Sequence, residues 1–162
     1  MSVIIRLCRF APEELDRTGV QDLLAAVPLV SDETSFASAL AAGTLFDLGN
    51  EWEVVHAALT GGSPDSRGAG YQPVLGGGML GRTETEVLVS LAPTDVDDVA
   101  HYLSGLDPQR QVSGNLTAME AAHGGEISDR FAHHVVNVLQ SLSTFYVRAA
   151  SDGDAVVKLV YS

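Results

Sequence analysis

A tryptophan and a histidine stand one helical turn apart in a segment with a clear helical pattern. In the segment 50–61 (NEWEVVHAALTG), Trp52, Val55, His56 and Leu59 recur at intervals of three and four residues, so they share one face of a helix. Tryptophan and histidine each combine an apolar ring with a polar edge, which suits contact with a small ligand or a protein partner. The simpler alternative is that Trp52 anchors the core and that His56 is its satisfied, half-buried neighbour.

The glycine-rich segment 61–82 directly follows this helix. It holds eight of the 16 glycines of the chain. Because glycine has no side chain to bury, we expect a long, mobile loop here, and loops of this length in a compact domain are usually functional or mobile. We therefore expect the loop and the helix face to form one binding surface, with Asp47, Trp52, His56 and Tyr71 as its candidate binding residues.

Residues 76–81 of this segment (GGGMLG) match the Gly-x-Gly-x-x-Gly fingerprint of dinucleotide-binding proteins. That fingerprint binds a pyrophosphate only where a strand precedes it and a helix follows, because the helix N-terminus supplies the amide N–H groups. Here an extended pattern carrying Glu84 and Glu86 follows instead. We therefore interpret the glycines as a flexible loop and do not predict nucleotide binding.

Other residues that could do chemistry do not converge in the sequence. Carboxylate–histidine pairs at helical spacing occur at Asp97 and His101, Asp129 and His133, and Glu120 and His123. A metal site needs three or four converging ligands, and such pairs are more often solvated helix surface. Cys8 lies in an apolar stretch, which is typical of an inert, buried thiol, and no Gly-x-Ser-x-Gly motif is present. We predict no metal and no cofactor, and the sequence leaves an enzymatic activity undecided.

Composition and charge restrict the classes of partner. The chain has 162 residues, of which 46% are hydrophobic and 19% are charged, as in globular domains. Nine Lys and Arg against 21 Asp and Glu give a formal net charge of −12, which disfavours binding to a nucleic-acid backbone. Lys158 is the only lysine, and no apolar run reaches the roughly 18 residues of a membrane helix, so no membrane contact is expected. One cysteine excludes an internal disulfide framework. These features predict a protein of the cytoplasm.

The remaining pattern predicts the elements that position the candidate residues. Strands are expected over 2–10, 85–91 and 155–161, and helices over 12–27, 34–42, 50–60, 93–104, 115–123 and 127–150. Residues 44–48 fit a strand or a helical turn, 73–75 a short extended piece, and 108–114 a turn-rich connection. Because regular β-α-β units are absent, we expect a single compact α+β domain over residues 1–162. It would have a small sheet packed by several helices, a long C-terminal helix, and a closing strand at the centre of the sheet or beside the first strand.

Several segments also resemble a known family. The stretch 47–61 (DLGNEWEVVHAALTG) is similar to the signature Asp-Leu-x-Lys-x-Trp-x-x-Leu-His-x-Leu-Leu-Thr-Gly of the YfbM-like bacterial family, a family of domains of unknown function. Further ordered matches are Ala-Pro-Glu-Glu-Leu at 11–15, Val-Leu-Gly-Gly at 74–77, Leu-Ala-Pro-Thr-Asp-Val at 91–96, Phe-Tyr at 145–146 and Gly-Asp-Ala-Val at 153–156. The family's usual Lys is Asn50 here, and Glu53 replaces a frequent second His. The resemblance implies a compact α+β fold in a bacterial cytoplasm and implies no particular reaction.

Two functional hypotheses follow from the sequence. The first is a non-enzymatic binding module for a protein or peptide partner. An acidic domain would favour a basic partner, and its affinity for that partner would fall as the salt concentration rises. The second is a small-molecule pocket, with or without enzymatic activity, between the Trp52 and His56 helix and the glycine-rich loop. Asp47 and Tyr71 would complete its lining. The oligomeric state is left open.

Overall fold

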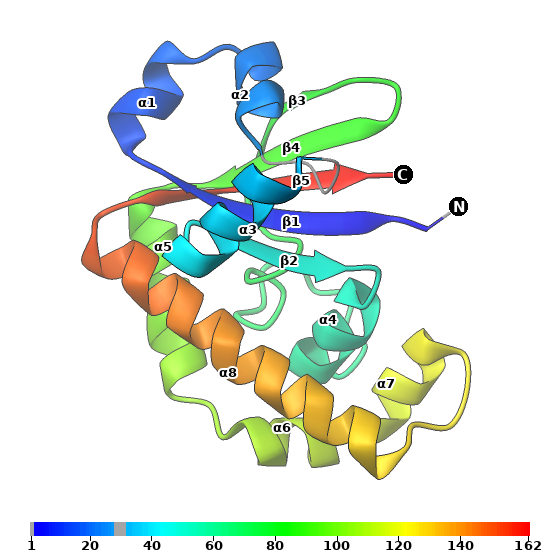
Figure 1. Cartoon of the computed structure of the whole chain (residues 1–162). Coiled ribbons are helices and arrows are strands. Elements are labelled where there is room, and N and C mark those ends of the chain that lie inside the picture. The colour runs from blue at the N-terminus through cyan, green and yellow to red at the C-terminus, as the bar shows by residue number, and fades with distance from the viewer. Residues whose placement is uncertain (1, 28–31) are drawn as a thin grey trace.

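Apolar, β-branched stretches near both ends of the chain form two of the three inner strands of one sheet. The computed structural model describes residues 2–27 and 32–162. In it, β1 (Ile4–Phe10) and β5 (Ala155–Tyr161) pair antiparallel from Ile4 opposite Tyr161 to Phe10 opposite Ala155. The sheet has the order β2-β1-β5-β4-β3, with β2 (Leu45–Gly49), β3 (Gly78–Arg82) and β4 (Glu86–Leu91) completing it (Figure 1). The closing strand is therefore central and lies beside the first strand, as the sequence predicted.

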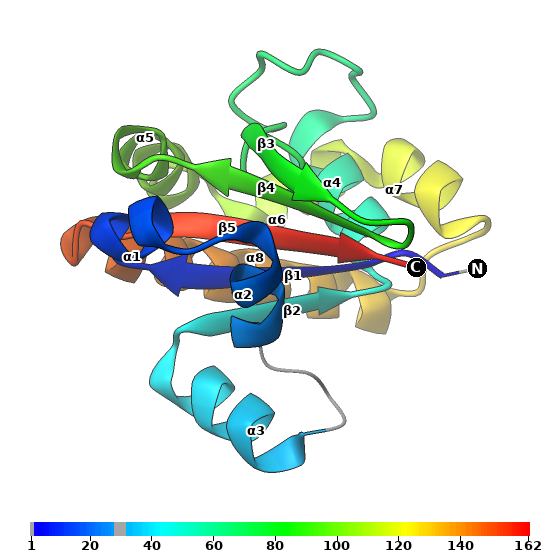
Figure 2. The ribbon, with the colours of Figure 1, turned by 90° about the horizontal axis from the view of Figure 1, so that it is seen from above.

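Helices pack on both faces of this sheet, which confirms the predicted α+β class and a single compact domain. The larger core lies between the sheet and α4 (Trp52–Thr60), α5 (Pro93–Ser104), α6 (Pro108–Gly114), α7 (Leu116–His123) and the long α8 (Asp129–Ser151). A smaller core lies on the other face, where α1 (Pro12–Arg17), α2 (Val20–Ala26) and α3 (Glu33–Ala42) pack over the sheet (Figure 2), with α2 in contact with β3 and α3 with β2. Side chains alternate along β5, so that Val156 enters the larger core and Val157 the smaller one.

The structure corrects two local predictions and settles one that had two alternatives. Residues 108–114 form α6 and not a turn-rich connection, because Asp107 accepts hydrogen bonds from the backbone N–H groups of Gln109 and Arg110 and Pro108 occupies the first turn. The helix expected over 12–27 is divided into α1 and α2 at Thr18 and Gly19. In the segment 44–48, which fitted a strand or a helical turn, residues 45–48 belong to strand β2.

The loop that follows α4 is shorter than the predicted loop over 61–82. The last five residues of the predicted loop form β3, and the backbone N–H of Thr83 donates to the carbonyl of Glu86 (2.8 Å) to close a hairpin with β4. Residues 73–75 are part of a turn and not an extended piece. We call residues 61–77 the glycine loop.

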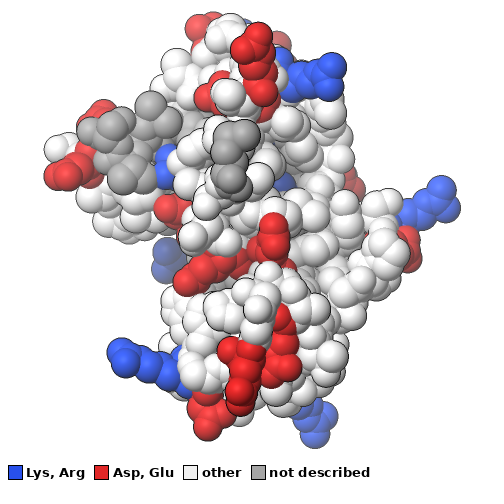
Figure 3. Space-filling view, turned by 90° about the vertical axis from the view of Figure 1, so that its right-hand side faces the viewer, with Lys and Arg blue, Asp and Glu red and all other residues white. Residues whose placement is uncertain are grey.

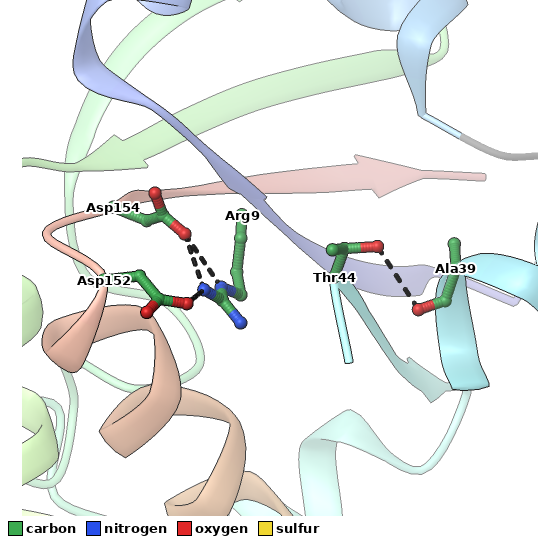
Figure 4. Close-up of polar contacts among 5 residues, drawn as sticks. All are labelled: Arg9, Ala39, Thr44, Asp152 and Asp154. Carbon is green, nitrogen blue, oxygen red and sulfur yellow. Dashed lines mark hydrogen bonds and ion pairs between the residues drawn. The ribbon is translucent and has the colours of Figure 1, made fainter. Parts of the chain in front are cut away.

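Two acidic residues fix the connection between α8 and β5 to the first strand. The guanidinium of Arg9 donates to Asp154 through Nε (3.0 Å) and Nη2 (2.7 Å), and Nη2 also contacts Asp152 (Figure 4). On the other side of β1, the backbone N–H of Arg9 donates to the carbonyl of Thr44, whose hydroxyl donates to the carbonyl of Ala39 (Figure 4). The Gly-Asp segment near the C-terminus thus has a structural role.

Cys8 is expected to be unreactive in the folded protein. It is 4% exposed in the smaller core, and burial raises the pKa of its thiol to about 12. At pH 8 the thiolate is therefore scarce, and access is also blocked. A thiol reagent should leave the native protein unlabelled and should modify one thiol per chain after unfolding in denaturant. Complete labelling of the native protein within minutes would contradict this placement.

Candidate functional site

Helix α4 places Trp52 and His56 on the face that turns toward the glycine loop. Trp52 is half-buried against the larger core, and its Nε1 donates to the backbone carbonyl of Val3 (3.1 Å). The helix ends at Gly61 in a left-handed conformation (φ 63°). A side chain there would meet the Asn115 amide oxygen at 2.9 Å, so a glycine is required for the turn into the loop.

His56 lies one turn after Trp52 and meets the ring of Tyr71 from the loop. The two ring centroids are 5.0 Å apart and the rings are nearly perpendicular, with an angle of 80°. The imidazole Nδ1 is buried and has no hydrogen-bond partner among the described residues. Burial lowers the pKa of His56 below its usual value, and the charge of Lys158 lowers it further. The neutral imidazole can present Nδ1 as an acceptor or as a donor, depending on the tautomer.

A cavity of about 360 Å³ opens between α4, α7 and the glycine loop. Its walls combine aromatic and small apolar side chains with few polar groups: Trp52, Glu53, His56, Ala57, Thr60, Gly62, Ser63, Pro64, Tyr71, Leu75, Ala118 and Ala122. Glu53 and the loop residues 62–64 are exposed. The cavity is therefore open at the surface, and its inner wall is formed by the rings.

Asp47 is not part of this cavity. It lies on β2, where its carboxylate contacts Nε of Arg6 (3.4 Å) and accepts from the backbone N–H of Gly49 (3.0 Å). The guanidinium of Arg6 also lies over the rings of Phe36 (4.9 Å) and Tyr161 (5.2 Å). Of the four candidate residues, the structure thus brings Trp52, His56 and Tyr71 together and directs Asp47 to an ion pair elsewhere.

The glycine loop is held at its end by two buried side chains, which corrects the prediction of a mobile loop for this part. The hydroxyl of Tyr146 donates to the carbonyl of Pro73 (2.6 Å). Nζ of Lys158 donates to the carbonyls of Gln72 and Gly76, the latter at 2.6 Å. Lys158 is 1% exposed, and burial lowers its pKa well below the usual value. Sequence reasoning assigned no role to either side chain, although a lone lysine in an apolar strand was a visible signal.

The glycines of the loop allow close backbone packing. A Cβ atom at Gly70 would lie 2.4 Å from the carbonyl oxygen of Leu59, and one at Gly76 would lie 2.5 Å from Cα of Gln72. After these contacts the chain enters β3 and not a helix, so the context that a dinucleotide fingerprint requires is missing. Packing therefore explains the glycines at these two positions.

A second and larger cavity, of about 730 Å³, lies on the other side of the loop, toward α5. Asp95, Asp98 and Tyr102 line it from the helix, and Tyr71 and Leu75 border both cavities. No group of three or more His, Cys, Asp or Glu within residues 2–27 and 32–162 could hold a metal ion. No helix in the same part of the chain is long and apolar enough to span a membrane.

The fold and this site define an α+β domain with a five-stranded antiparallel sheet and a ring-lined cavity beside the glycine loop. The chain belongs to the family described as a domain of unknown function (DUF1877), whose model matches residues 1–159. Among solved structures, it is similar to YfbM of Escherichia coli, a protein of unknown function, with 17% sequence identity and a TM-score of 0.62. That match covers 97% of this chain and 99% of the other and concerns the fold alone. No curated protein matches the sequence.

Proposed function

We propose that this chain is a non-enzymatic binding domain and that a side chain of a protein or peptide partner enters the cavity between α4 and the glycine loop. The observation that carries this proposal is His56, which lines the cavity and whose Nδ1 atom is buried and unpartnered among the described residues. A buried polar atom of this kind is costly unless a partner satisfies it. A ligand group that forms this hydrogen bond would therefore bind favourably.

Three other polar residues of the family-like segments have hydrogen-bond partners within the fold. Trp52 donates to Val3, Tyr146 to Pro73, and Asp154 accepts from Arg9, so each of them serves the fold. The His56 ring contacts Tyr71, and its Nδ1 atom has no hydrogen-bond partner among the described residues. This difference favours a binding role for His56 over a purely structural one.

The open shape of the cavity favours a protruding side chain over a fully enclosed ligand. Glu53 and the exposed loop residues 62–64 form the rim, and the net charge of −12 favours a basic partner. Acidic side chains gather over the middle and lower parts of the face shown in Figure 3, and the basic ones lie mostly at its margins. Attraction to such a surface weakens as salt rises.

A small-molecule ligand is the second candidate, because a volume of about 360 Å³ falls within the range of small-molecule sites, roughly 300–1,000 Å³. Such a ligand would stack against Trp52 or Tyr71 and hydrogen-bond to His56. A library of small molecules tested by thermal shift distinguishes the two candidates, since tight binding to the native state raises the melting temperature.

The test of the leading proposal uses affinity capture from the native lysate with a matched pair of histidine variants. We expect the wild type and His133→Asn, an exposed position on α8, to retain the same partner at low salt, and His56→Asn to lose it. The fluorescence of Trp52, the only tryptophan, should change when the captured partner is added to the wild type.

Thermal unfolding of all three proteins controls for loss of fold. Equal retention by His56→Asn would contradict the proposal, as would binding that leaves the Trp52 signal unchanged. If neither His56→Asn nor His133→Asn retained the partner, the loss of binding would not be specific to His56.

A further inference from the structure

The outer edge of β3 is an open end of the sheet. β3 stands last in the strand order and pairs with β4 alone. Its consecutive residues Met79 and Leu80 are 66% and 39% exposed. The unpaired backbone N–H and C=O groups of an edge strand are a template for a further strand, and exposed apolar side chains on it favour such pairing.

The ladder also fixes which backbone groups face this edge at the end of β3, beyond the register shift between Met79 and Gly81. At the end of the hairpin, the backbone N–H of Thr83 donates to the carbonyl of Glu86, and the N–H of Glu86 donates to the Thr83 hydroxyl. Arg82 opposite Val87 is the next pair. Hydrogen-bonded and non-hydrogen-bonded pairs alternate in an antiparallel ladder. The backbone N–H and C=O of Arg82 therefore point away from β4, toward the open edge.

The large cavity lies at the beginning of the same strand. Its walls are formed by Gly76, Gly77 and Gly78 on one side and by Asp95 and Asp98 of α5 on another. Both carboxylates are exposed, and neither forms an ion pair within the described part of the chain. Arg67 is the basic group of the lining, and it comes from the loop side.

We propose that this edge and cavity together bind an extended basic peptide segment, which adds to β3 as a sixth strand and places a Lys or Arg side chain beside Asp95 and Asp98. Main-chain hydrogen bonds to an edge strand supply affinity, and the cavity supplies side-chain selectivity. The exposed Met79 and Leu80 would be covered by apolar side chains of the peptide.

Charge decides between this occupant and a second copy of the same chain. A second copy would bring another net charge of −12 and another pair of carboxylates to the same edge, which is unfavourable for association. A basic segment has the complementary charge. The proposal concerns a surface other than the cavity at His56 and does not depend on binding there.

The experiment selects peptides from a random displayed library on the intact protein and compares two neighbouring carboxylates. Asp98 lines the cavity, whereas Asp97 is exposed on the same helix and does not line it. We expect the enriched peptides to alternate Lys or Arg with β-branched or aromatic residues. A representative peptide should bind Asp98→Asn about threefold more weakly than the wild type, as for loss of one exposed ion pair, and should bind Asp97→Asn almost as the wild type does.

Hydrogen exchange supplies the readout at the backbone. Bound peptide should slow exchange at the amide of Arg82 and leave the central strand β5 unchanged. Equal weakening by Asp97→Asn would overturn the proposal, because it would indicate unspecific charge attraction. Enriched peptides without a basic preference would overturn it too, as would unchanged exchange at Arg82 or dimerisation of the free chain that protects β3.

Discussion

The Lys158→Met variant is expected to lose stability relative to the wild type as the pH rises from 7 to 10. Lys158 is buried, and its pKa in the folded state lies well below the usual value. The unfolded chain therefore binds more protons at this residue up to a pH of about 10.4, so the wild type gains stability with rising pH. The gain is at most about 1.4 kcal/mol per pH unit. Methionine keeps much of the apolar stem of lysine but does not titrate, so it adds no pH dependence to the stability of the variant.

The difference in the free energy of unfolding between the wild type and Lys158→Met isolates the contribution of Lys158 from those of other groups that titrate between pH 7 and 10. Cys8 has the opposite effect, because its raised pKa means that the unfolded chain loses the thiol proton first, and stability falls above a pH of about 8.5. Both proteins contain Cys8, so its contribution cancels. Denaturant unfolding at pH 7, 8, 9 and 10 gives the two free energies of unfolding. Parallel curves would contradict a depressed pKa at Lys158.

The same variant also tests the attachment of the glycine loop. Without Nζ, the carbonyls of Gln72 and Gly76 lose their side-chain donor, and an unsatisfied buried carbonyl costs about 1–3 kcal/mol. The removal of a buried amine offsets part of this cost. We therefore expect faster hydrogen exchange at residues 71–77 in the variant.

Replacement of Trp52 by alanine is expected to lower the free energy of unfolding by about 3 kcal/mol, near the lower end for such truncations because the ring is only half-buried. The variant loses the packing of the indole on the larger core and the hydrogen bond to Val3. Trp52→Phe keeps an aromatic ring and should cost about 1 kcal/mol for the lost hydrogen bond.

Unfolding of the Trp52 variants must be followed by circular dichroism, because Trp52 is the only tryptophan. A loss below about 0.5 kcal/mol for Trp52→Ala, the range of ordinary surface substitutions, would contradict its role as an anchor. It would leave Trp52 available mainly for a ligand.

The sequence predicted most of the fold because periodicity is a local property. The repeat from Phe131 to Ala149 predicted α8, and the apolar run 155–161 predicted the inner strand β5. Helix α6 was missed because glycine and proline in 107–114 were interpreted as turn signals, although Asp107-Pro108 is also a helix start. β3 was missed because its two glycines have a low strand propensity.

The grouping of the candidate site residues was predicted only in part, because local spacing reveals neighbours on one helix but not contacts between distant segments. Trp52 and His56 share a helix face, so local spacing placed them together, and Tyr71 was correctly associated with them through the loop. Asp47 is close in sequence but lies on a strand that directs it to Arg6. The roles of Lys158 and Tyr146 depend on which segment packs above them, and no local pattern contains that information.

The position of β5 has a consequence for synthesis of the protein. β5 joins β1 to β4, so the β1–β2 and β3–β4 halves of the sheet remain unconnected until residues 155–161 have left the ribosome. Until then, the apolar strands of the nascent chain lack their shared neighbour. We therefore expect the sheet to form only after residues 155–161 have emerged, with its unpaired strands exposed to chaperones in the interval.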